Sequence, residues 1–170
     1  MPTTEAARRI IENREVVPDR WTFLADDAPV PHAGPVVVSW ARWRAERDAL
    51  GGRADLGVQV PSDVGPEDVA PDVDHFALIA LEFPKFTDGR AYSTARLLRQ
   101  RYGYRGTLRA VGDVLRDQLF YMARCGFNAF QLKEGKDVDD ALRAFEELSV
   151  KYQPAADDPL PLWKRHRRAS

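Results

Sequence analysis

Charged side chains gather in two stretches of this chain, each directly after an apolar run typical of a buried strand. The first follows residues 75–83 and the second surrounds the end of residues 107–111. The charged residues concerned are Lys85, Asp88, Arg90, Arg109, Asp113, Arg116 and Asp117. In open α/β sheets, ligands bind outside the carboxyl ends of the strands. The pattern therefore predicts a binding surface at the ends of these two strands.

The cations of this group could form an anion site. An arginine guanidinium matches sulfate, phosphate or carboxylate with two parallel hydrogen bonds, and a helix N-terminus adds free amides and a favourable dipole. The residues predicted to bind an anion are Lys85, Arg90, Arg109 and Arg116. The alternative is a structural network, in which these cations pair with Glu82, Asp88, Asp113 or Asp117.

The carboxylates allow a second interpretation, in which Asp88 or Asp113 is a catalytic general base and Arg90 and Arg109 clamp an anionic substrate. Asp113 and Asp117 stand four residues apart and are expected to share one helix face, as paired carboxylates for acid–base chemistry or a divalent metal do. The alternative is that one caps the helix and the other complements its dipole. The three histidines have no metal-ligand spacing, so no metal site is predicted.

No cofactor is predicted, although a flavin at the strand ends stays open. Neither the dinucleotide fingerprint G-x-G-x-x-G nor the phosphate-binding G-x-x-x-x-G-K-[ST] occurs. The single cysteine, Cys125, excludes an internal disulfide and an iron–sulfur cluster ligated within this chain. We expect it to be a buried structural residue.

Composition indicates a soluble globular protein. The 170 residues are 44% hydrophobic and 30% charged, with a net charge of −1, so no overall field attracts nucleic acid or a membrane. No apolar run reaches the ~18 residues of a membrane span, and the N-terminus lacks the apolar core of a secretory signal. We expect a cytoplasmic protein without a nucleic-acid or membrane partner.

Strand and helix patterns alternate from residue 36 onward, which predicts an α/β fold with a parallel sheet. About five parallel strands are expected, at residues 36–39, 56–60, 75–83, 107–111 and 128–132. The helices that follow the last three strands are expected to be capped by Thr87 or Asp88, by Asp113 and by Asp137, respectively. Two architectures fit this alternation, a flavodoxin-like sandwich and a half (β/α) barrel.

Three segments are predicted. Residues 1–35 form an N-terminal β appendage and linker, in which residues 9–11 and 21–24 pair as a hairpin. Residues 36–153 form the α/β domain. Residues 154–170 form a basic tail around Lys164–Arg168, interpreted as solvated rather than as a tether for anions or nucleic acid.

Three long motifs link the chain to a known family. They are FPKFTDGRAYS from Phe83, LRAVGDVLRDQ from Leu108 and MARCGFNAF from Met122. With them, residues 36–153 resemble bacterial domain-of-unknown-function family 934, whose members are labelled oxidoreductases of sulfite reduction. The motif positions present here are Phe83, Pro84, Lys85, Phe86, Asp88, Gly89, Arg90, Arg109, Gly112, Asp113, Arg116, Asp117 and Gln118.

The resemblance implies a role in assimilatory sulfate reduction beside the haem-containing sulfite reductase. We expect an accessory protein that binds a small oxyanion, or docks on the sulfite reductase haemoprotein through the charged strand ends. One alternative is a small-molecule enzyme of the oxidoreductase kind, although the chain carries no redox cofactor motif. Another is a structural or regulatory protein without a ligand.

Overall fold

The computed structural model describes residues 8–85 and 88–151, so the predicted basic tail at 154–170 lies outside the described residues. The strands are β1 (Arg9–Glu12), β2 (Glu15–Pro18), β3 (Thr22–Phe23), β4 (Val36–Ser39), β5 (Leu56–Val60), β6 (Leu78–Phe83), β7 (Thr107–Gly112) and β8 (Ala129–Phe130). The helices are α1 (Trp40–Ala45), α2 (Arg47–Leu50), α3 (Pro66–Val69), α4 (Arg90–Gln100), α5 (Leu119–Cys125) and α6 (Val138–Lys151), with 3₁₀ turns η1 (Ala70–His75) and η2 (Arg116–Gln118).

The described strands form one eight-stranded sheet in the order β2-β1-β8-β7-β6-β5-β4-β3. Strands β3 to β8 are parallel and lie side by side in chain order. The predicted α/β class and the five predicted parallel strands are confirmed, as β4 to β8. The count of about five was too low. The unbroken chain order is that of a half (β/α) barrel, because a flavodoxin-like sheet reverses its strand order at a switch point.

The N-terminal hairpin forms, but not from the predicted runs. Strand β1 pairs antiparallel with β2, and Asn13 and Arg14 make the two-residue turn with φ of 52° and 68°. Positive φ at both turn positions matches the right-handed twist of the flanking strands. The predicted second strand, residues 21–24, instead supplies β3, which lies parallel to β4 at the far edge of the sheet.

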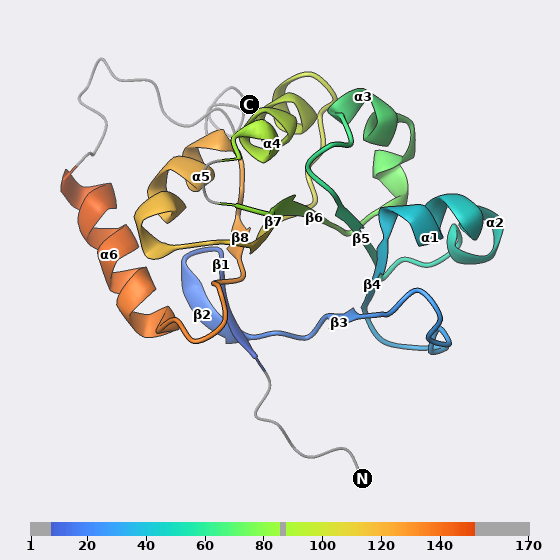
Figure 1. The fold of residues 1–170 in the computed structure, drawn as a ribbon, viewed down its shortest axis with the longest axis horizontal. Coiled ribbons are helices and arrows are strands. Elements are labelled where there is room, and N and C mark those ends of the chain that lie inside the picture. The colour runs from blue at the N-terminus through green and yellow to red at the C-terminus, as the bar shows by residue number, and fades with distance from the viewer. Residues whose placement is uncertain (1–7, 86–87, 152–170) are drawn as a thin grey trace, which may run out of the picture.

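A short link between the two edge strands requires the sheet to curl. Strands β2 and β3 stand at opposite edges, yet only residues 19–21 connect them. A flat sheet of eight strands would separate its edges by roughly 34 Å. The extended link spans only ~14 Å. The sheet therefore bends until its edges approach each other, and the segment 19–23 lies across its concave side (Figure 1).

The two faces of the curled sheet have different cores. The helices cover the convex face (Figure 1), where alternate strand residues such as Val58, Leu81 and Ala110 pack on helix residues such as Trp43 and Met122. The concave face holds a smaller cluster, made by Trp21 and Phe23 of the crossing segment with Val37, Leu78, Ala80 and Val111 of the strands. Side chains of neighbouring strand residues point to opposite faces, so each strand contributes to both cores.

One of the predicted helix caps is found, because the Asp137 carboxylate accepts the Asp140 backbone N–H at the start of α6. Gly89 occupies the cap position of α4, and Asp88, one residue earlier, accepts the Arg90 backbone N–H. Thr87 lies outside the described residues. Asp113 was expected to cap the next helix, but regular turns begin only at Arg116. The Asp113 backbone N–H instead donates to the Phe83 carbonyl at 2.7 Å, which extends the pairing of β6 and β7 by one residue.

Candidate functional site

Polar side chains line the concave face where the parallel strands end. Gln59 and Glu82 each precede the last residue of their strand, β5 and β6, and Gln131 follows β8. Because the carboxyl ends of parallel strands meet at one edge, the three side chains surround one opening. A pocket of ≈ 340 Å³ lies there. Its lining residues are Arg8, Phe23, Gln59, Glu82, Phe83, Pro84, Val111, Gly112 and Gln131.

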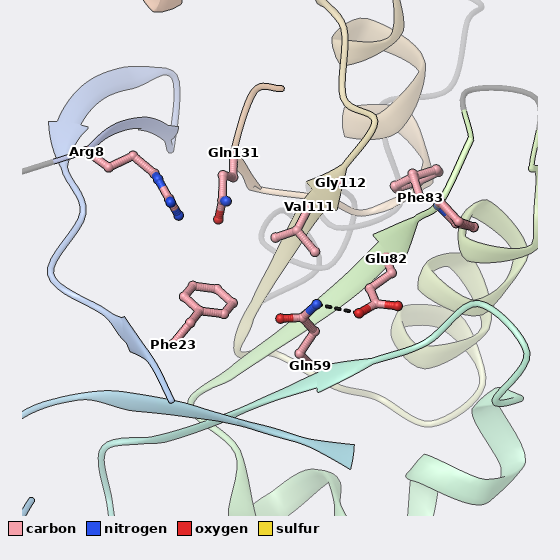
Figure 2. Close-up of a pocket in the computed structure, with 9 residues that line it drawn as sticks. Arg8, Phe23, Gln59, Glu82, Phe83, Val111, Gly112 and Gln131 are labelled. Atoms are coloured by element: carbon pink, nitrogen blue, oxygen red, sulfur yellow. Dashed lines mark hydrogen bonds between the residues drawn. The ribbon is translucent and has the colours of Figure 1, made fainter. Parts of the chain in front are cut away.

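Glu82 and Gln59 form the acceptor side of this pocket. The Gln59 amide nitrogen donates to one carboxylate oxygen of Glu82 (Figure 2), which fixes both side chains across neighbouring strands. The second Glu82 oxygen and the Gln59 amide oxygen have no hydrogen bond to any described residue. Both side chains are half-buried. A ligand that offers an N–H or O–H group can therefore bind at this side.

Arg8 and Gln131 form the donor side. The Gln131 amide oxygen accepts a hydrogen bond from Arg109 at 2.8 Å, so its amide nitrogen stays available as a donor. Arg8 reaches from the start of β1 toward Gln131 (Figure 2). Within the described part of the chain, its exposed guanidinium has no carboxylate partner. Two donors therefore face the two acceptors across one small opening.

Arg109 lies beneath this opening and forms a buried ion pair with Asp19. Its side chain is 0% exposed and makes two hydrogen bonds to Asp19, at 2.9 and 2.5 Å, while the guanidinium lies 5.1 Å from the Phe23 ring centroid. The predicted anion-binding residue is thus already occupied by a carboxylate from the crossing segment. Because a buried charge needs a partner in a site without water, this pair fastens the segment to β7.

Arg90 lies in a separate cluster at the start of α4. It donates three hydrogen bonds to Asp88, two from its side chain and one from its backbone, and a fourth to Ser62. The side-chain hydrogen bond from Arg90, followed by the backbone one, holds the pKa of Asp88 well below its usual range. Lys85 is exposed beyond the end of β6. Arg90 and Arg109 bind different carboxylates and share no partner, so the predicted convergence on one anion is not found.

The remaining predicted residues lie in two further ion-pair groups, one around Arg116 and one at Asp113. Arg116 pairs with Asp140 of α6 at 2.6 Å and approaches Asp117 to 3.8 Å, and Lys133 lies 3.4 Å from Asp113. The prediction that Asp113 and Asp117 share a helix face was wrong, because Asp113 belongs to the turn after β7 and not to the helix. That turn depends on Gly112, whose φ is +94° and whose added Cβ would lie 2.5 Å from the Phe83 carbonyl oxygen.

The residues that line the pocket were not predicted as site residues. Glu82 was considered only as a structural partner, and Gln59, Gln131 and Arg8 were not singled out. A usable signal was present for two of them. Gln59 in LGVQV and Glu82 in LIALEF are polar residues near the end of otherwise apolar strands, at positions that share the concave face. Arg8 and Gln131 depend on the position of β1 beside β8, which the sequence pattern does not indicate.

Among the described residues, no three side chains of histidine, cysteine, aspartate or glutamate are grouped so that they could hold a metal ion. In the same residues, no helix has the length and apolarity needed to cross a membrane. Cys125 is buried, as expected, and its sulfur lies 3.4 Å from the Arg96 guanidinium.

Comparison with known proteins identifies the family. No curated protein and no solved structure gave a match. A family model described as "Bacterial protein of unknown function (DUF934)" matches residues 57–163. This match spans more than half of the chain and includes the ends of β5 to β8, which surround the pocket. The chain therefore belongs to the bacterial family DUF934.

Proposed function

We propose that this protein is a cytoplasmic accessory protein of assimilatory sulfite and sulfate reduction, and that it binds a small oxyanion in the pocket at the strand ends. One observation supports this assignment above the others. Two donors, Arg8 and the Gln131 amide, face two acceptors, Glu82 and the Gln59 amide oxygen, across an opening of ≈ 340 Å³. The involvement of sulfite reduction comes from the family resemblance.

The donor–acceptor arrangement suits an anion that still carries a proton. Hydrogensulfite is such an anion, since it has negatively charged oxygens for Arg8 and Gln131 and an acidic hydrogen for Glu82. A charge-assisted hydrogen bond contributes about 1.5–3 kcal/mol. Two of these contribute about 3–6 kcal/mol, and the cost of association offsets much of that gain, so the dissociation constant should not fall below the millimolar range. We therefore expect weak, salt-sensitive binding.

A thermal-shift titration with sulfite and with sulfate tests the proposal. Millimolar sulfite should raise the melting temperature of the wild type, and added sodium chloride should reduce the shift through screening. Arg8→Gln should remove the shift without altering the melting temperature of the free protein, because Arg8 is exposed. Arg44→Gln, on the exposed surface of α1, is the matched control and should keep the shift.

Glu82 favours a second candidate, a small-molecule enzyme of the oxidoreductase kind. In the earlier interpretation the base was Asp88 or Asp113, but neither lines the pocket, whereas the Glu82 carboxylate does. Sulfite reduction by the isolated protein with a nicotinamide or dithionite donor would favour the enzyme over the accessory protein. If sulfite shifts neither the wild type nor the control, the binding proposal is wrong and a structural or regulatory role is favoured.

A further inference from the structure

One stretch of the chain is rich in arginine and free of acid. Between Asp88 and Asp113 there is no aspartate or glutamate. The same stretch contains Arg90, Arg96, Arg99, Arg101, Arg105 and Arg109. It includes helix α4, which packs against α5 on the convex side of the sheet, and α5 adds Arg124 (Figure 1). Of these arginines, Arg109 is buried on the concave side, whereas Arg96, Arg101 and Arg124 are exposed.

The exposed arginines of this face contact aromatic rings and a thiol in place of carboxylates. Arg96 lies 3.5 Å from the Tyr121 hydroxyl and 3.4 Å from the Cys125 sulfur. Arg101 lies over the Tyr102 ring and Arg124 over the Phe120 ring, at 5.7 and 5.8 Å from the centroids. The aromatic contacts hold the guanidinium groups in place and leave their N–H groups facing water.

Elsewhere the described arginines commonly have carboxylate partners. Ion pairs of the described residues join Arg9 to Asp139, Arg42 to Glu46, Arg47 to Asp72, Arg53 to Asp55, Arg90 to Asp88, Arg109 to Asp19 and Arg116 to Asp140. Among the described residues, Arg96, Arg101 and Arg124 form no ion pair with a carboxylate. The positive charge of the α4–α5 face is therefore not neutralised by neighbouring described side chains.

Apolar side chains are exposed within the same face. Tyr121 on α5 is 51% exposed and Leu97 on α4 is 36% exposed. The Tyr121 ring also packs on Tyr92, with 4.9 Å between ring centroids, so it is held in a defined orientation. Tyrosine and arginine are enriched at the residues that dominate binding in protein–protein interfaces. An exposed tyrosine among unpaired arginines is typical of a docking surface.

We propose that the exposed α4–α5 face, formed by Arg96, Leu97, Arg101, Tyr121 and Arg124, docks a partner protein that presents a carboxylate-rich surface. The charge of the face selects an acidic partner, and its exposed tyrosine and leucine match a protein interface. Helices α4 and α5 lie on the convex side of the sheet (Figure 1), whereas concave-face residues such as Phe23, Gln59 and Glu82 line the pocket, so a docked partner leaves the pocket open. Only the identification of this partner as the sulfite reductase haemoprotein rests on the proposed function.

Two charge-reversal variants of the full-length protein test the surface. The first carries Arg101→Glu and Arg124→Glu. The control carries Arg44→Glu on α1 and Arg143→Glu on α6, both exposed, and has the same net charge as the first variant. Binding to immobilised poly-L-glutamate at low ionic strength should weaken at least fivefold in the first variant and less than twofold in the control. Far-ultraviolet circular dichroism verifies that both variants are folded.

Three results would overturn the proposal. They are equal weakening in both variants, no binding of poly-L-glutamate by the wild type, and tighter binding of a single-stranded DNA oligomer, which would indicate a nucleic-acid surface. A second arm uses purified sulfite reductase haemoprotein. If it binds the wild type and the first variant equally, the docking surface is wrong while the proposed function stands. If it binds neither, but poly-L-glutamate still discriminates the variants, the surface stands and the proposed partner is wrong.

Discussion

The concave interior of the curled sheet and the convex α4–α5 face use the same side chain in opposite ways. Inside, Arg109 is 0% exposed and is held by Asp19 with two hydrogen bonds. Outside, Arg101 and Arg124 lie on aromatic rings and have no carboxylate among the described residues. A buried arginine requires a hydrogen-bonding or charged partner within the fold. An exposed arginine is solvated and can bind a group on another molecule.

This difference separates charges that stabilise the fold from charges that are available for recognition. Sequence position at a strand end did not distinguish the two, since Arg109 and Arg90 both lie in the motif and neither faces the pocket as an open cation. Exposure and the presence of a carboxylate partner do distinguish them. The following predictions test the comparison, beginning with the largest expected effect.

Removing one member of the interior pair should have the largest effect. Arg109→Met leaves the Asp19 carboxylate buried without a cation, and breaking a buried pair in this way costs about 3–5 kcal/mol. Denaturant unfolding should show this loss in the free energy of unfolding. Combining Arg109→Met with Asp19→Leu removes both charges and should recover a large part of it. A loss below about 1 kcal/mol in Arg109→Met would show that the interior pair does not hold the fold closed.

Glycine substitutions extend the comparison to the backbone. Gly112→Ala, at the mouth of the interior, forces φ of +94° on alanine and brings its Cβ within 2.5 Å of the Phe83 carbonyl. Strain of this kind costs about 1–3 kcal/mol before the steric clash is added. Gly52→Ala, at an exposed position with open space around the added carbon, should change stability by less than about 0.5 kcal/mol. If Gly112→Ala and Gly52→Ala lowered the thermal-unfolding midpoint equally, the conclusion that the turn at position 112 requires glycine would be wrong.

The exposed pair at the start of α4 should have the smallest effect. Arg90 is 59% exposed, so water screens its ion pair with Asp88, and Arg90→Ala should lower the free energy of unfolding only slightly. Because Arg90 lowers the folded-state pKa of Asp88, the pair stabilises the fold above the ordinary carboxyl pKa and loses this contribution as the pH falls. The stability difference between wild type and Arg90→Ala should be constant above about pH 5 and shrink below about pH 4. A difference that grows in acid would contradict this linkage.

Local patterns in the sequence predicted the parallel core well. The strands β4 and β5 begin and end where apolar runs predicted, because each is bounded by a strong turn or cap signal. The strand predicted at residues 75–83 begins three residues later, since Ala70–His75 continues as a 3₁₀ turn. Strand order was left open between two architectures, because adjacency in a sheet depends on which pairs lie together and not on local periodicity.

The site was harder to predict because long-range pairing decides it. Asp19 and Arg109 are 90 residues apart, and no local spacing indicates that the crossing segment places a carboxylate on β7. For the same reason Arg8 could not be assigned to the mouth of the pocket, since it depends on the antiparallel pairing of β1 with β8. The pocket lies at the strand ends where the charges predicted a binding surface, but its lining includes none of the predicted anion-binding residues.

The crossing segment also constrains the order in which the chain can assemble during its synthesis. Residues 19–23 leave the ribosome well before β7 and β8, on which Asp19 and the β1–β2 hairpin depend for pairing. Strands β1 and β2 must therefore remain unpaired with the rest of the sheet until about residue 130 has emerged. Contacts so distant in sequence slow folding, and unpaired strand edges promote aggregation in the interval. The segment that connects the two edges of the sheet is thus synthesised among the first residues, but the Asp19–Arg109 ion pair that holds it forms among the last contacts.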